Sequence, residues 1–199
     1  MKMGLWLRSA TRSLALAGML AALSCNVQAA ALMTLSGTTD EVKHASEAEV
    51  RLSILGWTAD EQQAVVVAEY QKYVDSQDHA GFAKFLRGLD TQGYLFTDSP
   101  LGYTIKYAWQ DDSSRPRKMV LMVVPALKRN NPYMWKTANT AAAPFSLVEV
   151  QVAGDTATMK SSLDGKIAIT ESGKLQLQDY DSAQVFATLK DATPYYLKR

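Results

Sequence analysis

The chain has 199 residues, of which 47% are hydrophobic and 21% charged, and its formal net charge is +1. This composition is that of a folded globular protein and excludes a disordered one. The near-neutral charge also argues against nucleic acid as a partner, because binding to phosphates requires an excess of Lys and Arg.

The N-terminus has the organisation of a secretory signal peptide. Lys2, Arg8 and Arg12 precede an apolar run over 14–23, and small side chains at the positions that signal peptidase recognises precede a cleavage point after Ala29. The run is shorter than the roughly 20 residues that span a bilayer, so we expect no transmembrane anchor after cleavage. Loss of these residues changes the formal charge to −2, and the protein is predicted to be periplasmic or secreted.

A single domain is predicted over 30–199. Residues 31–36 are compatible with a short first strand, and the polar stretch that follows makes 30–47 a candidate mobile N-terminal arm. Alternating apolar residues over 50–54 then predict a strand.

A two-helix block follows between Thr58 and Leu89. Thr58 and Glu61 have the spacing of a capping box, which predicts that a helix begins there and continues to about Val74. Asp78 is the predicted N-cap of a second, shorter helix with an apolar stripe.

The strongest strand signal lies at 103–110. Tyr103, Ile105, Tyr107 and Trp109 alternate with smaller or polar residues, which predicts four large side chains on one buried face beneath the helices. A run that is apolar on both parities, at 119–124, predicts a central strand.

Short strand patterns separated by turns complete the chain, at 145–152, 156–161, 167–170, 175–180 and 185–189. Strands at short spacing, with the helices confined to one block, are typical of the α+β class. We therefore predict a curved antiparallel meander of about eight strands packed against the two-helix block. The pattern does not distinguish an open sheet from a closed barrel.

The segment 126–144 has no clean period and is long for a loop in a compact domain. It holds Asn130, Asn131, Tyr133 and Trp135, which are the predicted ligand-binding residues because loops carry function more often than scaffolds do. The alternative is that the two aromatic side chains fold the loop down on the core.

Few residues point to catalysis. The only Cys lies in the predicted signal peptide, and His44 and His79 are too far apart in the sequence to suggest a shared metal, so we predict no metal site, no cofactor and no catalytic set. The candidate acid is Glu149, which lies inside an apolar strand and would have a raised pKa if it were buried. An edge position in the sheet or a pair with Lys106 is the alternative.

Several segments resemble a group of small exported bacterial proteins that have no assigned activity. They are GWTADE (56–61), LRGL (86–89), GYLFT (93–97), LGYTIKYA (101–108) and PFSLVEV (144–150). The resemblance implies a bacterial, exported, single-domain protein and carries no catalytic residue.

Three functions remain open on the sequence. The leading hypothesis is a non-enzymatic binding or interaction module of the cell envelope, whose partner is an envelope protein or a small molecule. The second is an envelope hydrolase or transferase that uses carboxylates. The third is a carrier of an apolar ligand, which predicts a cavity behind Tyr103 and Trp109.

Overall fold

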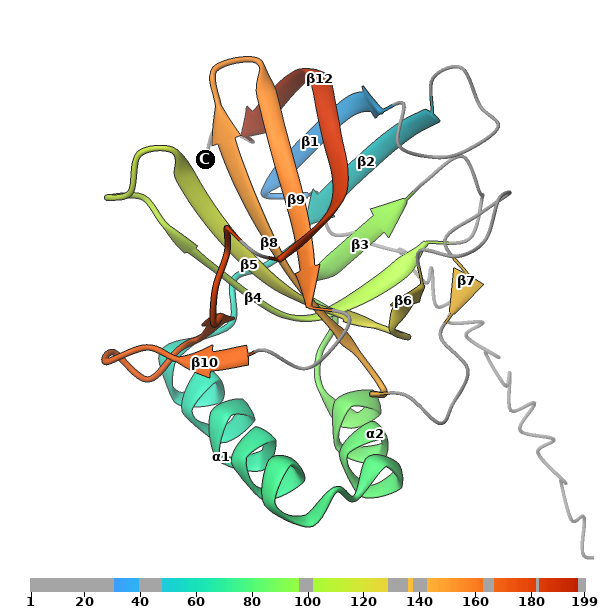
Figure 1. Cartoon of the computed structure of the whole chain (residues 1–199), viewed down its shortest axis with the longest axis vertical. Coiled ribbons are helices and arrows are strands. Elements are labelled where there is room, and N and C mark those ends of the chain that lie inside the picture. The colour runs from blue at the N-terminus through green and yellow to red at the C-terminus, as the bar shows by residue number, and fades with distance from the viewer. Residues whose placement is uncertain are drawn as a thin grey trace, which may run out of the picture.

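The computed structural model describes residues 31–39, 48–96, 102–128, 136–137, 143–162, 167–181 and 183–196. Its main element is a closed barrel of antiparallel strands (Figure 1). The barrel strands are β1 (Met33–Thr39), β2 (Ala48–Ile54), β3 (Gly93–Phe96), β4 (Tyr103–Asp111), β5 (Arg117–Val124), β8 (Ser146–Ala153), β9 (Thr156–Ser162) and β12 (Gln184–Tyr196).

The eight strands follow one another around the barrel in chain order, and β1 closes it by pairing with β12, with Met33 opposite Tyr196. The predicted α+β class and the antiparallel sheet are confirmed. The sheet closes on itself, where the sequence left an open sheet equally acceptable. The described part of the stretch 30–47 is mainly β1, so this part is a strand of the barrel wall and not an arm.

The barrel interior is a packed core. Twenty buried hydrophobic residues of the described part of the chain fill it, and Leu52, Ile105, Leu121 and Val148 have no exposed surface. An eight-stranded barrel is just wide enough for its inward side chains to fill it. An apolar-ligand carrier with its cavity behind Tyr103 therefore finds no support in this core.

Two helices lie between β2 and β3 in the sequence. They are α1 (Asp60–Ser76) and α2 (His79–Gly88), and they lie together at one end of the molecule (Figure 1). Asp78 caps α2 as predicted, because its carboxylate accepts from the Gly81 N–H at 2.9 Å. In the described part of the chain, no helix has the length and apolar character needed to cross a membrane.

The capping box predicted at Thr58 is wrong. The N-cap of α1 is Ala59, without a side-chain cap. Thr58 instead pairs with β4: its N–H donates to the Ala108 carbonyl at 2.8 Å, and its hydroxyl accepts from the Ala108 N–H at 2.9 Å. The hydroxyl therefore fixes the start of α1 to the barrel wall.

A β-bulge overturns the predicted face of β4. Ile105 pairs with Val123 but Tyr107 pairs with Met122, so Lys106 is an extra residue. One extra residue reverses the side-chain alternation of the rest of a strand. Tyr103 and Ile105 therefore belong to the barrel interior, whereas Tyr107 and Trp109 belong to a second core on the outer face.

The second core lies between the outer face of β4, β5 and β8 and the elements that cover it, which are α1, α2 and a small hairpin. The hairpin consists of β10 (Ile167–Ile169) and β11 (Leu175–Leu177), which pair with each other and leave the barrel sheet. A further short ladder joins β6 (Leu127–Lys128) to β7 (Lys136–Thr137). With both faces of β5 covered, Met119 to Val123 are all buried, as the sequence predicts.

Candidate ligand-binding site

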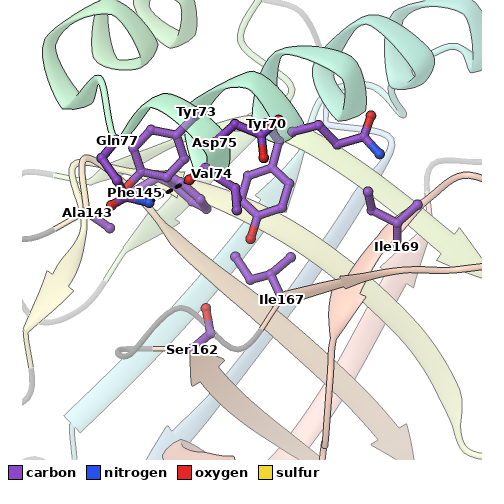
Figure 2. Close-up of a pocket in the computed structure, with 11 residues that line it drawn as sticks. Tyr70, Tyr73, Val74, Asp75, Gln77, Ala143, Phe145, Ser162, Ile167 and Ile169 are labelled. Carbon is purple, nitrogen blue, oxygen red and sulfur yellow. Dashed lines mark hydrogen bonds between the residues drawn. The ribbon is translucent and has the colours of Figure 1, made fainter.

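A cavity of about 600 Å³ opens between the C-terminal half of α1 and the hairpin strand β10 (Figure 2). We call it the α1–β10 cavity. Its volume lies in the range of small-molecule sites, roughly 300–1,000 Å³. It is lined by Tyr70, Gln71, Tyr73, Val74, Asp75, Gln77, Ala143, Phe145, Ser162, Ile167 and Ile169.

Aromatic rings form one wall of the α1–β10 cavity. Tyr70 and Tyr73 each meet Phe145 edge to face, with centroids 6.1 and 6.2 Å apart. Tyr73 also stacks on Phe82 of α2 at 4.8 Å. Such ring pairs add stability beyond their buried area, so the wall is held in place before any ligand arrives.

The two tyrosines remain neutral donors and acceptors. Burial raises the pKa of Tyr70, with a further contribution from the neighbouring Tyr73, and burial also raises the pKa of Tyr73. Figure 2 shows the Tyr70 hydroxyl directed towards Ile167, across the cavity. The Tyr73 hydroxyl lies 3.2 Å from Nδ1 of His79, which ties α1 to the first turn of α2.

Polar atoms lie around this apolar wall. The Ser162 hydroxyl is buried and finds no hydrogen-bond partner among the described residues, and Figure 2 shows it across the cavity from α1. Gln71, Asp75 and Gln77 are exposed at the helix side of the opening. The cavity therefore combines aromatic and aliphatic surface with a large share of polar surface, so it offers hydrogen-bond partners as well as apolar contacts.

The opposite wall is β10, whose Ile167 and Ile169 face α1 (Figure 2). Side chains of β4 fasten the hairpin to the barrel. The Trp109 Nε1–H donates to the Leu175 carbonyl at 2.8 Å, and the Leu175 N–H donates to the Tyr107 hydroxyl at 3.2 Å. The bulge in β4 is what turns both rings outward to make these bonds.

Glu149 also anchors the hairpin. Its side chain is almost fully buried, with 2% of the residue exposed, and its carboxylate accepts from the Leu177 N–H of β11. Desolvation raises the pKa of Glu149, although Lys118, Gln151, the Leu177 N–H and Lys160 act in the opposite direction. Both alternatives for Glu149 are wrong. Its strand β8 lies between β5 and β9 and is not an edge strand, and Lys118 lies 3.9 Å from Glu149, whereas Lys106 donates to the Leu89 carbonyl at 2.7 Å.

This placement leaves Glu149 without a route to a substrate in the α1–β10 cavity, because it is not among the residues that line the cavity. Its contacts are with β11 and with neighbouring side chains of the barrel wall. The aspartates at the β4–β5 turn are likewise structural. Asp111 accepts from the Ser113 hydroxyl and from the Ser113 and Ser114 N–H groups, and these bonds lower the pKa of its carboxyl.

The predicted ligand residues Asn130, Asn131, Tyr133 and Trp135 lie outside the described residues. The cavity residues were not predicted as a site, although one signal was present. The sequence places Val74 on the apolar stripe of α1, which normally faces a core. In the structure Val74 is 46% exposed because it faces the cavity and no other side chain of the described residues covers it. Within the described ranges, no three His, Cys, Asp or Glu side chains come together as a metal site would require.

The protein is a packed antiparallel barrel with a cavity of small-molecule size outside the barrel, between α1 and the β10–β11 hairpin. Comparison with models of protein families, with curated proteins and with solved structures found no match to the chain.

Proposed function

We propose that the protein is a non-enzymatic binding module of the bacterial cell envelope and that its ligand binds in the α1–β10 cavity. The observation that carries the proposal is the cavity of about 600 Å³ with the aromatic wall of Tyr70, Tyr73 and Phe145. Preformed aromatic walls hold small ligands at low entropic cost.

The burial of Glu149 favours binding over hydrolysis. A general acid must reach the reacting atom within hydrogen-bond distance. The Glu149 carboxylate instead accepts hydrogen bonds from the Leu177 N–H and the Gln151 amide, and it pairs with Lys118. The best candidate acid is thus a structural residue, and a hydrolase or transferase loses its main support.

The envelope location rests on the signal-peptide pattern that ends at Ala29. Mass spectrometry of the protein recovered from the periplasm or the medium of an expressing bacterium tests it. A mass that begins at Ala30 supports export, and an intact chain found only in the cytoplasm contradicts it.

A matched pair of substitutions on α1 tests the cavity. Val74 and Val65 are both exposed, at 46% and 52%, but only Val74 lines the cavity. We use 4-phenylbutan-1-ol as the probe, since its ring and hydroxyl match the apolar and polar parts of the lining. Val74→Lys should weaken its binding at least about tenfold, because the longer side chain would fill part of the cavity and place a charge beside the apolar body of the probe, and Val65→Lys should leave the dissociation constant unchanged.

Isothermal titration or ligand-observed NMR gives both dissociation constants. Neither substitution should unfold the protein, because surface changes usually shift stability by less than about 0.5 kcal/mol. Equal binding to both variants would place the ligand elsewhere, and no binding of the probe to the wild type at millimolar concentration would contradict the proposal.

A further inference from the structure

Among the described residues that line the α1–β10 cavity, the formal charge has one sign. Asp75 is the one formally charged side chain among the described lining residues, which include no Lys, Arg or His. Asp75 forms no ion pair with another described residue. The cavity therefore presents a negative group that is free to pair with a ligand.

The C-terminus of α1 adds to this negative potential. Of the lining residues, Tyr70, Gln71, Tyr73, Val74 and Asp75 belong to the final turns of α1, and Gln77 is its C-cap. Helix C-termini carry a partial negative charge, and the last turn of α1 holds no basic residue of its own to offset it. Gln77 satisfies only two of the terminal carbonyls, through its N–H to Tyr73 and its side-chain amide to Val74 at 2.8 Å.

The aromatic wall also favours a cation. The face of a tyrosine ring attracts an ammonium within about 6 Å of the centroid. This protein uses the same contact elsewhere, because Lys160 Nζ lies 4.3 Å from the centroid of Tyr180. Tyr73 is half-buried at the cavity, close to Asp75 along α1.

The remainder of the lining defines the body of the ligand. Val74, Ile167 and Ile169 offer aliphatic surface opposite the rings, and the buried Ser162 hydroxyl offers one hydrogen bond. Taking the binding function proposed above as given, we infer that the α1–β10 cavity takes an amphipathic organic cation. Its ammonium lies beside Asp75 at the C-terminus of α1, and its aromatic or branched aliphatic body lies between Tyr70 and β10.

Three probes of matched shape and different charge test the inference at pH 7. They are 4-phenylbutylamine, which is a cation, 4-phenylbutan-1-ol, which is neutral, and 4-phenylbutyrate, which is an anion. The amine should bind about five to ten times more tightly than the alcohol, and the carboxylate should bind most weakly. The preference should fall as salt is raised, because Asp75 is exposed.

Asp75→Asn supplies the second arm, with Asp90→Asn as its control. Asp90 is also exposed and does not line the cavity. Asp75→Asn should reduce the preference for the amine over the alcohol to about twofold or less while alcohol binding persists, and Asp90→Asn should preserve the preference. Equal binding of the amine and the alcohol to the wild type would overturn the inference and leave the binding function standing, whereas failure of every probe to bind would contradict the binding function itself.

Discussion

At the scale of single residues, Glu149 shows how a polar side chain can serve a fold from within an apolar surface. Its neighbours along the strand, Val148 and Val150, point into the barrel, so Glu149 points outward beneath β11. A buried backbone N–H without a partner is costly, and the carboxylate meets that need for Leu177. The sequence identified Glu149 as unusual, but its partner comes from a strand far away in the chain.

Substitution of Glu149 should affect stability before anything else. Glu149→Ala leaves the Leu177 N–H without its acceptor and should lower the free energy of unfolding by about 1–3 kcal/mol. Glu149→Gln retains an acceptor oxygen and should cost less. Urea unfolding of both variants measures the two effects, and equal losses would show that the hydrogen bond to β11 is unimportant.

The pH dependence has a definite sign. Burial raises the pKa of Glu149 above its ordinary value of 4.5, so the folded protein binds this proton more tightly than the unfolded chain does. The protonated carboxyl therefore stabilises the folded protein fully when the pH is below the ordinary pKa, and this stabilisation is lost as the pH rises through the raised pKa. As the pH rises through this range, the free energy of unfolding of Glu149→Gln should increase relative to that of the wild type. A difference between the two proteins that stays constant with pH would show that the pKa of Glu149 is not raised.

At the scale of elements, β4 shows what a sequence pattern can and cannot reveal. The alternation from Tyr103 to Trp109 correctly predicts a strand, but it gives no sign of the extra residue at Lys106. The bulge falls where the neighbours of β4 change, from β3, whose pairing ends at Ile105, to Thr58, which pairs with Ala108. Because the tertiary structure fixes these neighbours, the local sequence pattern of β4 does not reveal that its side chains switch faces at Lys106.

Deletion of Lys106 tests the importance of the bulge. Without the extra residue, Tyr107 and Trp109 would turn into a filled interior, so the deletion variant should lose cooperative folding. Lys106→Met is the matched control, since it keeps the bulge and loses only the bonds to the Leu89 carbonyl and the Thr91 hydroxyl. It should cost about 1–2 kcal/mol.

Circular dichroism and tryptophan fluorescence in urea distinguish the two variants. If the deletion variant unfolded as cooperatively as Lys106→Met, the reversal of the β4 face would not be required by the fold.

At the scale of the whole molecule, the barrel supplies the packed core, and the proposed binding site lies outside it. The α+β class, the antiparallel strands and the helical block could be predicted from the sequence, because each depends on local periodicity. The cavity depends on the departure of the hairpin at 167–177 from the barrel, which short strand patterns do not record. The aromatic signal at Tyr133 and Trp135 lies outside the described residues and stays a prediction.

The central claim is that a ligand binds outside the barrel, between α1 and β10. The most direct measurement is a methyl-resolved NMR titration of the protein with 4-phenylbutylamine. Methyl groups of Val74, Ile167 and Ile169 should shift on binding, because they line the cavity, whereas those of Leu121 and Val148 in the filled interior should not. Shifts confined to the interior methyl groups, or none at saturating probe, would contradict the claim.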